Sequence, residues 1–237
     1  MERETHSSEP QHITITEYKS GQWGLKPDVA SAEASVSFEY NGRDHSLWAW
    51  PDMLEDLVAG HALLDLGGGY RKTSVMIQAN GIYTVTTGDH LPNNLEPGKL
   101  HGAEIMEGMR TFMGKEGLWN GTGCFHRAGV FDAASKTVVH RTEDIGRHNC
   151  VDRLAGWASR TETPLSGLVL MISARMTSSL CAKAIRAGFK FIVSRSAVTS
   201  AALNMAQEHD ITLIGFARDN ENRFSVFHDL ETPRVLT

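Results

Sequence analysis

The feature that most constrains the fold is an alternation of apolar runs and helical segments in the last third of the chain. Short, mainly apolar runs of the kind that form strands covered on both faces occupy residues 168–173, 189–194 and 211–217. Two segments with helical spacing of apolar residues separate them, at 178–187 and 198–208. Connections of this kind are right-handed crossovers between parallel strands. The sequence therefore predicts an α/β fold with a largely parallel sheet.

The residues before this alternation extend the same domain. We expect strands at 125–132 and 137–141 and helices at 100–113 and 144–159, with 224–227 as a candidate edge strand. Helices on both faces of one sheet form an α/β/α arrangement. Residues 99–237 are therefore predicted to form a single α/β domain.

The first part of the chain has a β-rich pattern. Asn41-Gly42 suits a tight turn between alternating runs at 34–40 and 43–50, and a second strand pair is expected at 73–77 and 82–87. A helix is predicted from Pro51-Asp52 through Leu64. The polar loop 88–98 marks a boundary, so we assign residues 33–98 to a small β-rich domain. Residues 1–32 are predicted to be an arm and loop, with one short strand at 13–18 and a loop from 19 to 32.

Composition narrows the classes of function. The chain has 23 basic and 28 acidic residues and a formal charge of −5, so the basic footprint of a nucleic-acid-binding protein is absent. No run of eighteen apolar residues predicts a membrane span, and residues 1–11 lack the apolar core of a signal peptide. The three cysteines form no C-x-x-C pair, which argues against a disulfide framework and a cysteine-based structural metal site. We therefore expect a cytoplasmic protein without nucleic-acid or membrane partners.

Polar side chains follow the predicted parallel strands. Ser173 and Arg175 follow the first strand, while Ser194, Ser196 and Thr199 follow the second. Carboxyl ends of parallel strands meet at one sheet edge, where hydroxyls and helix N-termini suit an anion. Arg175 or Arg195 could add a bidentate contact to a phosphate. The alternative is that the hydroxyls only cap helices and the arginines are only solvated.

A second polar cluster lies in 143–149. It combines Asp144, Gly146, Arg147, His148 and Asn149. A glycine inside a helix costs roughly 1 kcal/mol relative to alanine, so Gly146 is easier to explain if a ligand or second backbone approaches closely. Alone, His148 would be interpreted as a core histidine, but beside these neighbours it favours ligand recognition. This segment is the predicted centre of an anion or nucleotide site.

A third cluster precedes the strand at 125–132. Thr122 and Gly123 form a turn that can present backbone amides to an anion. Cys124 lies two residues from His126, and an imidazole can activate a thiol, which makes Cys124 a candidate catalytic nucleophile. The alternative is a small buried cysteine with a packing role.

Taken together, these segments resemble a known family. The residues Thr122-Gly-Cys-Phe-His126, Glu143-Asp-Ile-Gly-Arg-His-Asn149 and Asp152-Arg-Leu-Ala-Gly156 are similar to the patterns TGGxHxA and EDxGRHNAxDKxxG of the FdhD-type formate dehydrogenase accessory proteins. Ile172-Ser-Ala-Arg175 resembles their SGR strand end, and Asn41-Gly42 with Asp56-Leu-Val-Ala-Gly60 resembles their NG and DLxxGF elements. The resemblance runs from about residue 33 to residue 227.

The resemblance implies a fold, a ligand and partners. It implies a small, mainly β N-terminal part, a C-terminal domain of cytidine deaminase-like architecture, and a homodimer. It also implies binding of molybdopterin guanine dinucleotide (Mo-bis-MGD) or a GDP-like nucleotide, sulfur relay from a cysteine desulfurase, and delivery to formate dehydrogenase. Carried over by position, the cofactor-binding candidates are Thr122, Gly123, His126, Asp144, Gly146, Arg147, His148, Asn149, Ser173, Arg175, Ser194, Ser196 and Thr199.

The chain departs from this family pattern where sulfur chemistry would occur. Typical members carry Cys-x-x-Cys on the loop between the two parts, whereas residues 86–100 here contain no cysteine. Cys124, which replaces the second glycine of TGG, is then the candidate sulfur carrier. Two alternatives remain: a nucleotide- or molybdopterin-binding module or sensor without sulfur transfer, and a hydrolase that uses His126 or His148 as its base.

Overall fold

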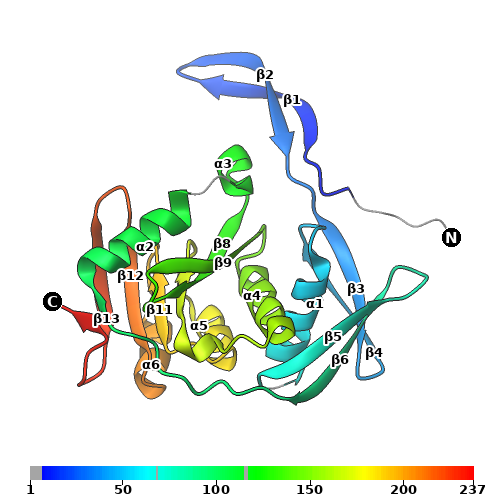
Figure 1. The fold of residues 1–237 in the computed structure, drawn as a ribbon. Coiled ribbons are helices and arrows are strands. Elements are labelled where there is room, and N and C mark those ends of the chain that lie inside the picture. The colour runs from blue at the N-terminus through cyan, green and yellow to red at the C-terminus, as the bar shows by residue number, and fades with distance from the viewer. Residues whose placement is uncertain (1–6, 68, 115–116) are drawn as a thin grey trace.

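The computed structural model describes residues 7–67, 69–114 and 117–237. Among the described residues, two larger sheets and a short parallel pair of strands, β7 and β14, form the body, and a separate two-stranded hairpin extends away from it (Figure 1). Within the described residues, no helix is long and apolar enough to cross a membrane.

The larger sheet has six strands in the order β13-β12-β11-β10-β8-β9. Their bounds are β8 His126–Asp132, β9 Thr137–Asp144, β10 Val169–Ile172, β11 Phe191–Ser194, β12 Thr212–Arg218 and β13 Arg223–His228. The central strands β10, β11 and β12 are parallel, as their apolar runs predicted. The flanking pairs β8–β10, β8–β9 and β12–β13 are antiparallel, so the sheet is mixed around a parallel centre.

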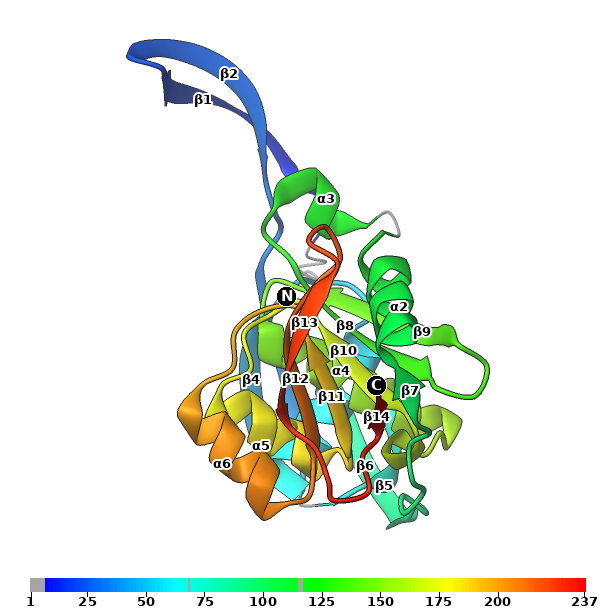
Figure 2. The ribbon, with the colours of Figure 1, turned by 90° about the vertical axis from the view of Figure 1, so that its left-hand side faces the viewer.

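Helices cover both faces of this sheet, as the sequence predicted (Figure 2). The helix α2 lies on one face, and α4, α5 and α6 lie on the other. The helices span α2 Gly102–Gly114, α4 Arg147–Thr161, α5 Ser178–Arg186 and α6 Ser200–Glu208, with a short helix α3 at Leu118–Thr122. Each face has its own apolar core because side chains alternate along the strands: Leu170 and Ile192 face α4 and α5, while Val169 and Phe191 face α2.

The smaller sheet has four strands in the order β4-β3-β6-β5 and packs on α1. Its elements are β3 Ala34–Tyr40, β4 Arg43–Ala49, α1 Leu54–His61, β5 Arg71–Ile77 and β6 Tyr83–His90. The predicted hairpin around Asn41-Gly42 is confirmed, because β3 and β4 pair in register across that turn. A π-helical turn, Ala62–Gly67, extends α1 beyond the predicted end at Leu64. The remaining short elements are β7 Leu100–His101, the 3-10 turn Leu165–Gly167 and β14 Val235–Leu236.

Two corrections concern particular segments. Residues 19–32 were expected to be loop, but β2 spans Gln22–Ala30 and pairs with β1, Gln11–Lys19, along its full length. The loop prediction was wrong because glycine and proline are tolerated in strands whose edges stay open. The helix predicted from residue 144 begins at Arg147, since Asp144 still belongs to β9. The division of the chain at residues 33 and 99 stays a prediction.

The helix α1, which packs on the smaller sheet, and the helix α4, which packs on the larger sheet, contact each other unusually closely. A Cβ atom on Gly60 would lie 1.7 Å from the carbonyl oxygen of Asp152, and one on Gly156 would lie 1.9 Å from that of Asp56. Both positions therefore require glycine. This contact fixes α4, which begins at the candidate site, against the N-terminal part.

Candidate functional site

The polar strand ends predicted from the sequence lie at one edge of the large sheet. In β10 and β11, Ile172 pairs with Ser194, and the amide of Arg195 donates to the Ile172 carbonyl at 2.9 Å. The loops that follow stay side by side, because Met176 donates to the Ala197 carbonyl at 2.9 Å. The N-termini of α5 and α6 follow these loops, so both helices direct partial positive charge toward this edge.

The other two predicted clusters reach the same edge through β8 and β9. The first residue of β8, His126, pairs with Asp144, the last residue of β9. Ser173 connects this pair to β10, since its amide donates to the Arg127 carbonyl at 3.0 Å and its Oγ accepts from the Arg127 amide at 2.9 Å. The helix α4 begins at Arg147 immediately beyond, so three helix N-termini border one edge.

Asp144 is fully buried and holds the loop in place. One carboxylate oxygen accepts from the Gly146 amide at 2.8 Å and from Asn149 Nδ2 at 2.9 Å. The other accepts from Arg153 Nε at 2.9 Å and Nη2 at 2.6 Å. Arg153 also donates to the carbonyls of Trp50, Asp52 and Met53. The Asp144 carboxylate therefore holds the loop before α4 in position and uses its hydrogen-bonding capacity within the chain.

The side chain of Asn149 in the same segment approaches Gly146 closely. A Cβ atom there would lie 2.9 Å from Asn149 Nδ2. That nitrogen also donates to the Trp48 carbonyl at 2.9 Å, which ties the start of α4 to β4. Gly146 is the N-cap of α4 with a φ of −93°, so it lies outside the helix interior in which it was expected, and the neighbour that approaches it is a side chain and not a second backbone.

Arg147 and Arg175 give this edge its charge. Neither guanidinium forms an ion pair with a residue that the structure describes, and the Nε of Arg147 is buried without a hydrogen-bond partner there. Arg195, the other arginine considered for a phosphate contact, is instead paired with Asp219 at 2.8 Å, so of the two only Arg175 is without an ion-pair partner among the described residues. Burial, and then the guanidiniums of Arg147 and Arg175, lower the pKa of His126 below its ordinary value. Two unpaired cations therefore lie close enough to His126 to disfavour its protonation.

The hydroxyls at the strand ends divide by role. Ser194 Oγ donates to the Ala174 carbonyl at 2.9 Å and accepts from the Ser196 amide at 3.1 Å, which fixes the loop after β11. Thr199 Oγ1 accepts from the Ala202 amide at 3.3 Å as the N-cap of α6. The capping interpretation is thus correct for Thr199.

His148 opens onto a cavity of about 300 Å³ that the sequence did not predict. Its Nε2 lies 3.0 Å from Ser179 Oγ. Burial, with Arg147 and Lys183 next, lowers the pKa of His148. His61 and Asp65, four residues apart on one helical face, also line the cavity, and that spacing is the signal from which they could have been found.

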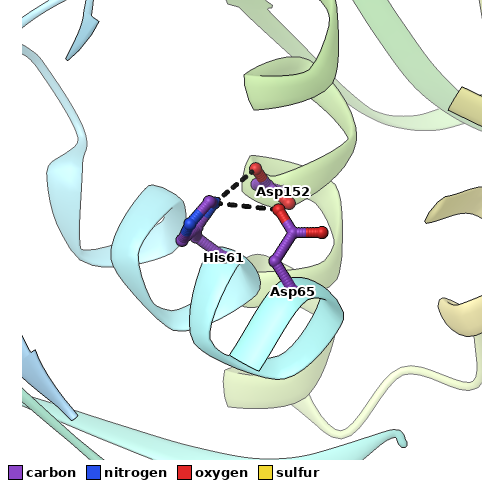
Figure 3. A group of neighbouring side chains, drawn as sticks. All are labelled: His61, Asp65 and Asp152. Atoms are coloured by element: carbon purple, nitrogen blue, oxygen red, sulfur yellow. Dashed lines mark hydrogen bonds and ion pairs between the residues drawn. The ribbon is translucent and has the colours of Figure 1, made fainter. Parts of the chain in front are cut away.

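His61, Asp65 and Asp152 converge in this cavity in the manner of metal ligands (Figure 3). His61 Nδ1 lies 3.1 Å from Asp65 and 3.4 Å from Asp152. Lys183 Nζ, which is 4% exposed, lies 2.8 Å from Asp65 and 2.7 Å from Asp152. The buried ammonium thus supplies the positive charge that these carboxylates require, in the place where a metal ion would otherwise supply it.

Cys124 is exposed, so the interpretation of it as a small buried cysteine was wrong. It follows a turn in which Thr122 Oγ1 accepts from its amide at 3.2 Å and Gly123 adopts a φ of +68°. With Ser31, Glu33, Trp48, Ile145 and Gly146, it lines a second cavity of about 320 Å³. The other two cysteines are buried: burial raises the pKa of Cys181 to about 11 and that of Cys150 well above its ordinary value. Among the three thiols, Cys124 is therefore the accessible one.

Most of these residues fall within a region shared with known proteins. The family model described as the FdhD/NarQ family matches residues 69–233. The chain belongs to the FdhD/NarQ family. This result agrees with the motifs at residues 122–126 and 143–156.

Relatives of known sequence support this membership. The chain is 38% identical over 124 residues to Protein FdhD of Methanocaldococcus jannaschii, which covers 52% of this chain and 53% of that protein. It is 37% identical to a sulfur carrier protein FdhD of Bacillus pumilus over 51% of this chain and 45% of that one. The matched stretch thus spans about half the length of these relatives. A sulfur carrier protein FdhD of Bordetella petrii is 29% identical over 81% of this chain and 82% of its own.

A solved structure shows the same fold. The crystal structure of a protein from Desulfotalea psychrophila, described as a proposed formate dehydrogenase accessory protein, matches with a TM-score of 0.81 at 23% identity. The match covers 96% of this chain and 99% of that one. The mixed α/β architecture is therefore shared with a protein of low sequence identity.

Proposed function

We propose that this chain is an accessory protein of formate dehydrogenase that binds the guanine-nucleotide-bearing molybdenum cofactor at the edge defined by β8, β10, β11 and the N-termini of α4, α5 and α6. The observation that carries the proposal is the pair of guanidiniums, Arg147 and Arg175, that have no carboxylate partner among the described residues. Family membership supports the choice of ligand.

The donors at this edge fit a diphosphate. Guanidiniums bind phosphate oxygens through paired N–H groups, and helix N-termini add amide donors and partial positive charge. Arg147 and Arg175 would hold the phosphates, and Thr122, Gly123 and Ser173 lie on the segments beside them. His126 would contact the same anion, since both cations already act on its pKa. The cofactor, when bound, supplies the molybdenum centre that accepts sulfur.

Isothermal titration calorimetry with GDP tests this proposal. We expect the wild-type chain to bind GDP and Arg147→Ala to weaken binding by roughly 10- to 100-fold, because a charged hydrogen bond contributes about 1.5–3 kcal/mol. Arg110→Ala is the matched control, since Arg110 lies on α2, on the opposite face of the sheet. Absence of GDP binding to the wild type, or equal weakening by both substitutions, would contradict the proposal.

Sulfur transfer, if the chain performs it, requires Cys124. The loop at residues 86–100 contains no cysteine, and Cys150 and Cys181 are buried with raised pKa values. The Cys124 thiolate would attack the outer sulfur of a desulfurase persulfide, forming Cys124–S–SH and releasing the desulfurase thiolate. Cys124 and Gly146 line the same cavity, which brings the thiol next to the proposed ligand site.

The alternative is a binding module or sensor that holds the nucleotide or molybdopterin without sulfur transfer. The missing loop cysteines favour it. Incubation with a cysteine desulfurase and cysteine, followed by mass spectrometry, separates the two. A mass gain of one sulfur that is lost in Cys124→Ser and kept in Cys181→Ser supports the carrier; no gain in the wild type supports the module. Either protein would act in the cytoplasm as a homodimer.

A further inference from the structure

A serine and a histidine are in contact in the wall of the cavity of about 300 Å³. Ser179 Oγ lies 3.0 Å from His148 Nε2. Ser179 is the second residue of α5 and His148 is the second residue of α4, so two helices bring together side chains 31 positions apart. Ser179 is exposed and His148 is partly buried. A hydroxyl within hydrogen-bond reach of an imidazole is the arrangement of a nucleophile and its general base.

His148 is in the protonation state that a general base requires. Burial, and then the charges of Arg147 and Lys183, lower its pKa below its ordinary value, so the imidazole is neutral at about pH 7. When Nδ1 carries the proton, Nε2 can accept the hydrogen of Ser179 Oγ. The imidazolium that forms would lie one helical turn from the fully buried carboxylate of Asp152, whose charge favours it.

The charged side chains that line the cavity neutralise one another. Lys183 Nζ lies 2.8 Å from Asp65 and 2.7 Å from Asp152. Arg186 Nη2 lies 2.9 Å from Asp65. Two cations therefore balance two carboxylates, and a phosphorylated or carboxylated substrate would meet two like charges. This balance favours an uncharged substrate, in contrast to the anion proposed at the neighbouring sheet edge.

We propose that Ser179 and His148 catalyse the hydrolysis of small, uncharged carboxylic esters in this cavity. Leu47 and Ala182 give the acyl group apolar contacts, and a volume of about 300 Å³ is at the lower end of ligand cavities, which suits a short acyl chain. The sequence offered His148 as a hydrolase base, and the structure adds the nucleophile. Neither side chain belongs to the phosphate-binding set of the proposed function, so this activity goes beyond it.

The reaction has two balanced steps. In the first, Ser179 Oγ attacks the ester carbonyl and His148 Nε2 takes the hydroxyl proton, which then passes to the departing alkoxide and releases an alcohol. In the second, water attacks the acyl group on Ser179, and His148 transfers a proton from the water to the serine oxygen as the carboxylic acid leaves. Each oxyanion forms beside the first turn of α5, where backbone amides and partial positive charge stabilise it.

An organophosphorus probe tests the nucleophile. Diisopropyl fluorophosphate should label the folded wild-type chain once, at Ser179, with loss of fluoride, as located by peptide mass spectrometry. Ser179→Ala removes the attacking oxygen and His148→Gln removes the base, so both variants should lose the label. Ser178→Ala is the matched control and should keep it, because Ser178 is also an exposed serine in the first turn of α5 but is not among the described residues that line the cavity.

Hydrolysis of p-nitrophenyl acetate measures turnover. The protein is first treated with iodoacetamide, so that the exposed thiol of Cys124 does not contribute. Ser179→Ala should lower kcat/KM at least about 100-fold relative to the wild type and to Ser178→Ala, at unchanged Tm. An unlabelled wild type, or equal turnover by the wild type and Ser179→Ala, would overturn the proposal. Both assays omit nucleotide, so neither result depends on GDP binding.

Discussion

Replacement of Gly156 by alanine distinguishes helix propensity from helix packing at the joint between the two parts. Gly156 lies inside α4, where alanine is favoured by roughly 1 kcal/mol. On propensity alone, Gly156→Ala should stabilise the protein. The structure predicts the opposite, since the new Cβ would lie 1.9 Å from the carbonyl oxygen of Asp56 in the backbone of α1.

The size of the effect follows from how far α1 must move. Real Cβ atoms essentially never approach another heavy atom within 3.0 Å, so the helices would have to separate by more than 1 Å. Overpacking of a tight core costs typically 1–3 kcal/mol, and more where backbone must shift. After the propensity gain is subtracted, we expect a loss of about 2 kcal/mol. For a chain of this length that corresponds to a decrease in Tm of roughly 4–8 °C.

Thermal and urea unfolding measure this loss. Gly114→Ala is the control: Gly114 ends α2, has no atom of the described residues within 4 Å of its would-be Cβ, and has no positive φ. It should be neutral or slightly stabilising. Gly60→Ala probes the same contact from the other helix, where the Cβ would lie 1.7 Å from the Asp152 carbonyl. If Gly156→Ala unfolds at or above the wild-type temperature, the close approach of α1 and α4 is refuted.

Three further predictions concern the site. Asp144→Asn leaves the buried guanidinium of Arg153 without its charged partner, and urea unfolding should show a loss of about 3–5 kcal/mol. GDP binding should strengthen as the pH falls. Burial and the neighbouring guanidiniums lower the pKa of His126 in the free protein, and a bound phosphate would raise that pKa. Binding of GDP should therefore be accompanied by uptake of a proton by His126. Calorimetry in buffers of different ionisation enthalpy should detect this proton uptake, and the His126→Gln variant should bind GDP without it. Iodoacetamide should label one thiol of the folded chain rapidly, at Cys124, and the two buried cysteines only after unfolding, as counted by mass spectrometry.

The sequence predicted best what depends on local pattern. The strands from residue 168 to residue 217 and the Asn41-Gly42 hairpin follow from hydrophobic periodicity and turn chemistry, which are properties of neighbouring residues. The strand β2 was missed because its partner β1 supplies pairing that composition does not reveal. The cavity around Lys183 was missed because the turn Ala62–Gly67 and α5 meet only in the folded chain, so no local spacing connects Asp65 to Lys183.

The candidate site shows a similar division within a single motif. Asp144 and Arg147 lie three residues apart in the same segment, and the sequence assigned both to the ligand. In the structure Asp144 is 0% exposed and bonded to its own loop, whereas Arg147 has no ion-pair partner among the described residues. Substitution of either should weaken GDP binding, but for different reasons. Arg147→Ala should do so at nearly unchanged stability, while Asp144→Asn should lower affinity and stability together, because the loop that carries Arg147 loses its anchor. Measuring both quantities for both variants therefore separates residues that contact the anion from residues that hold them in place.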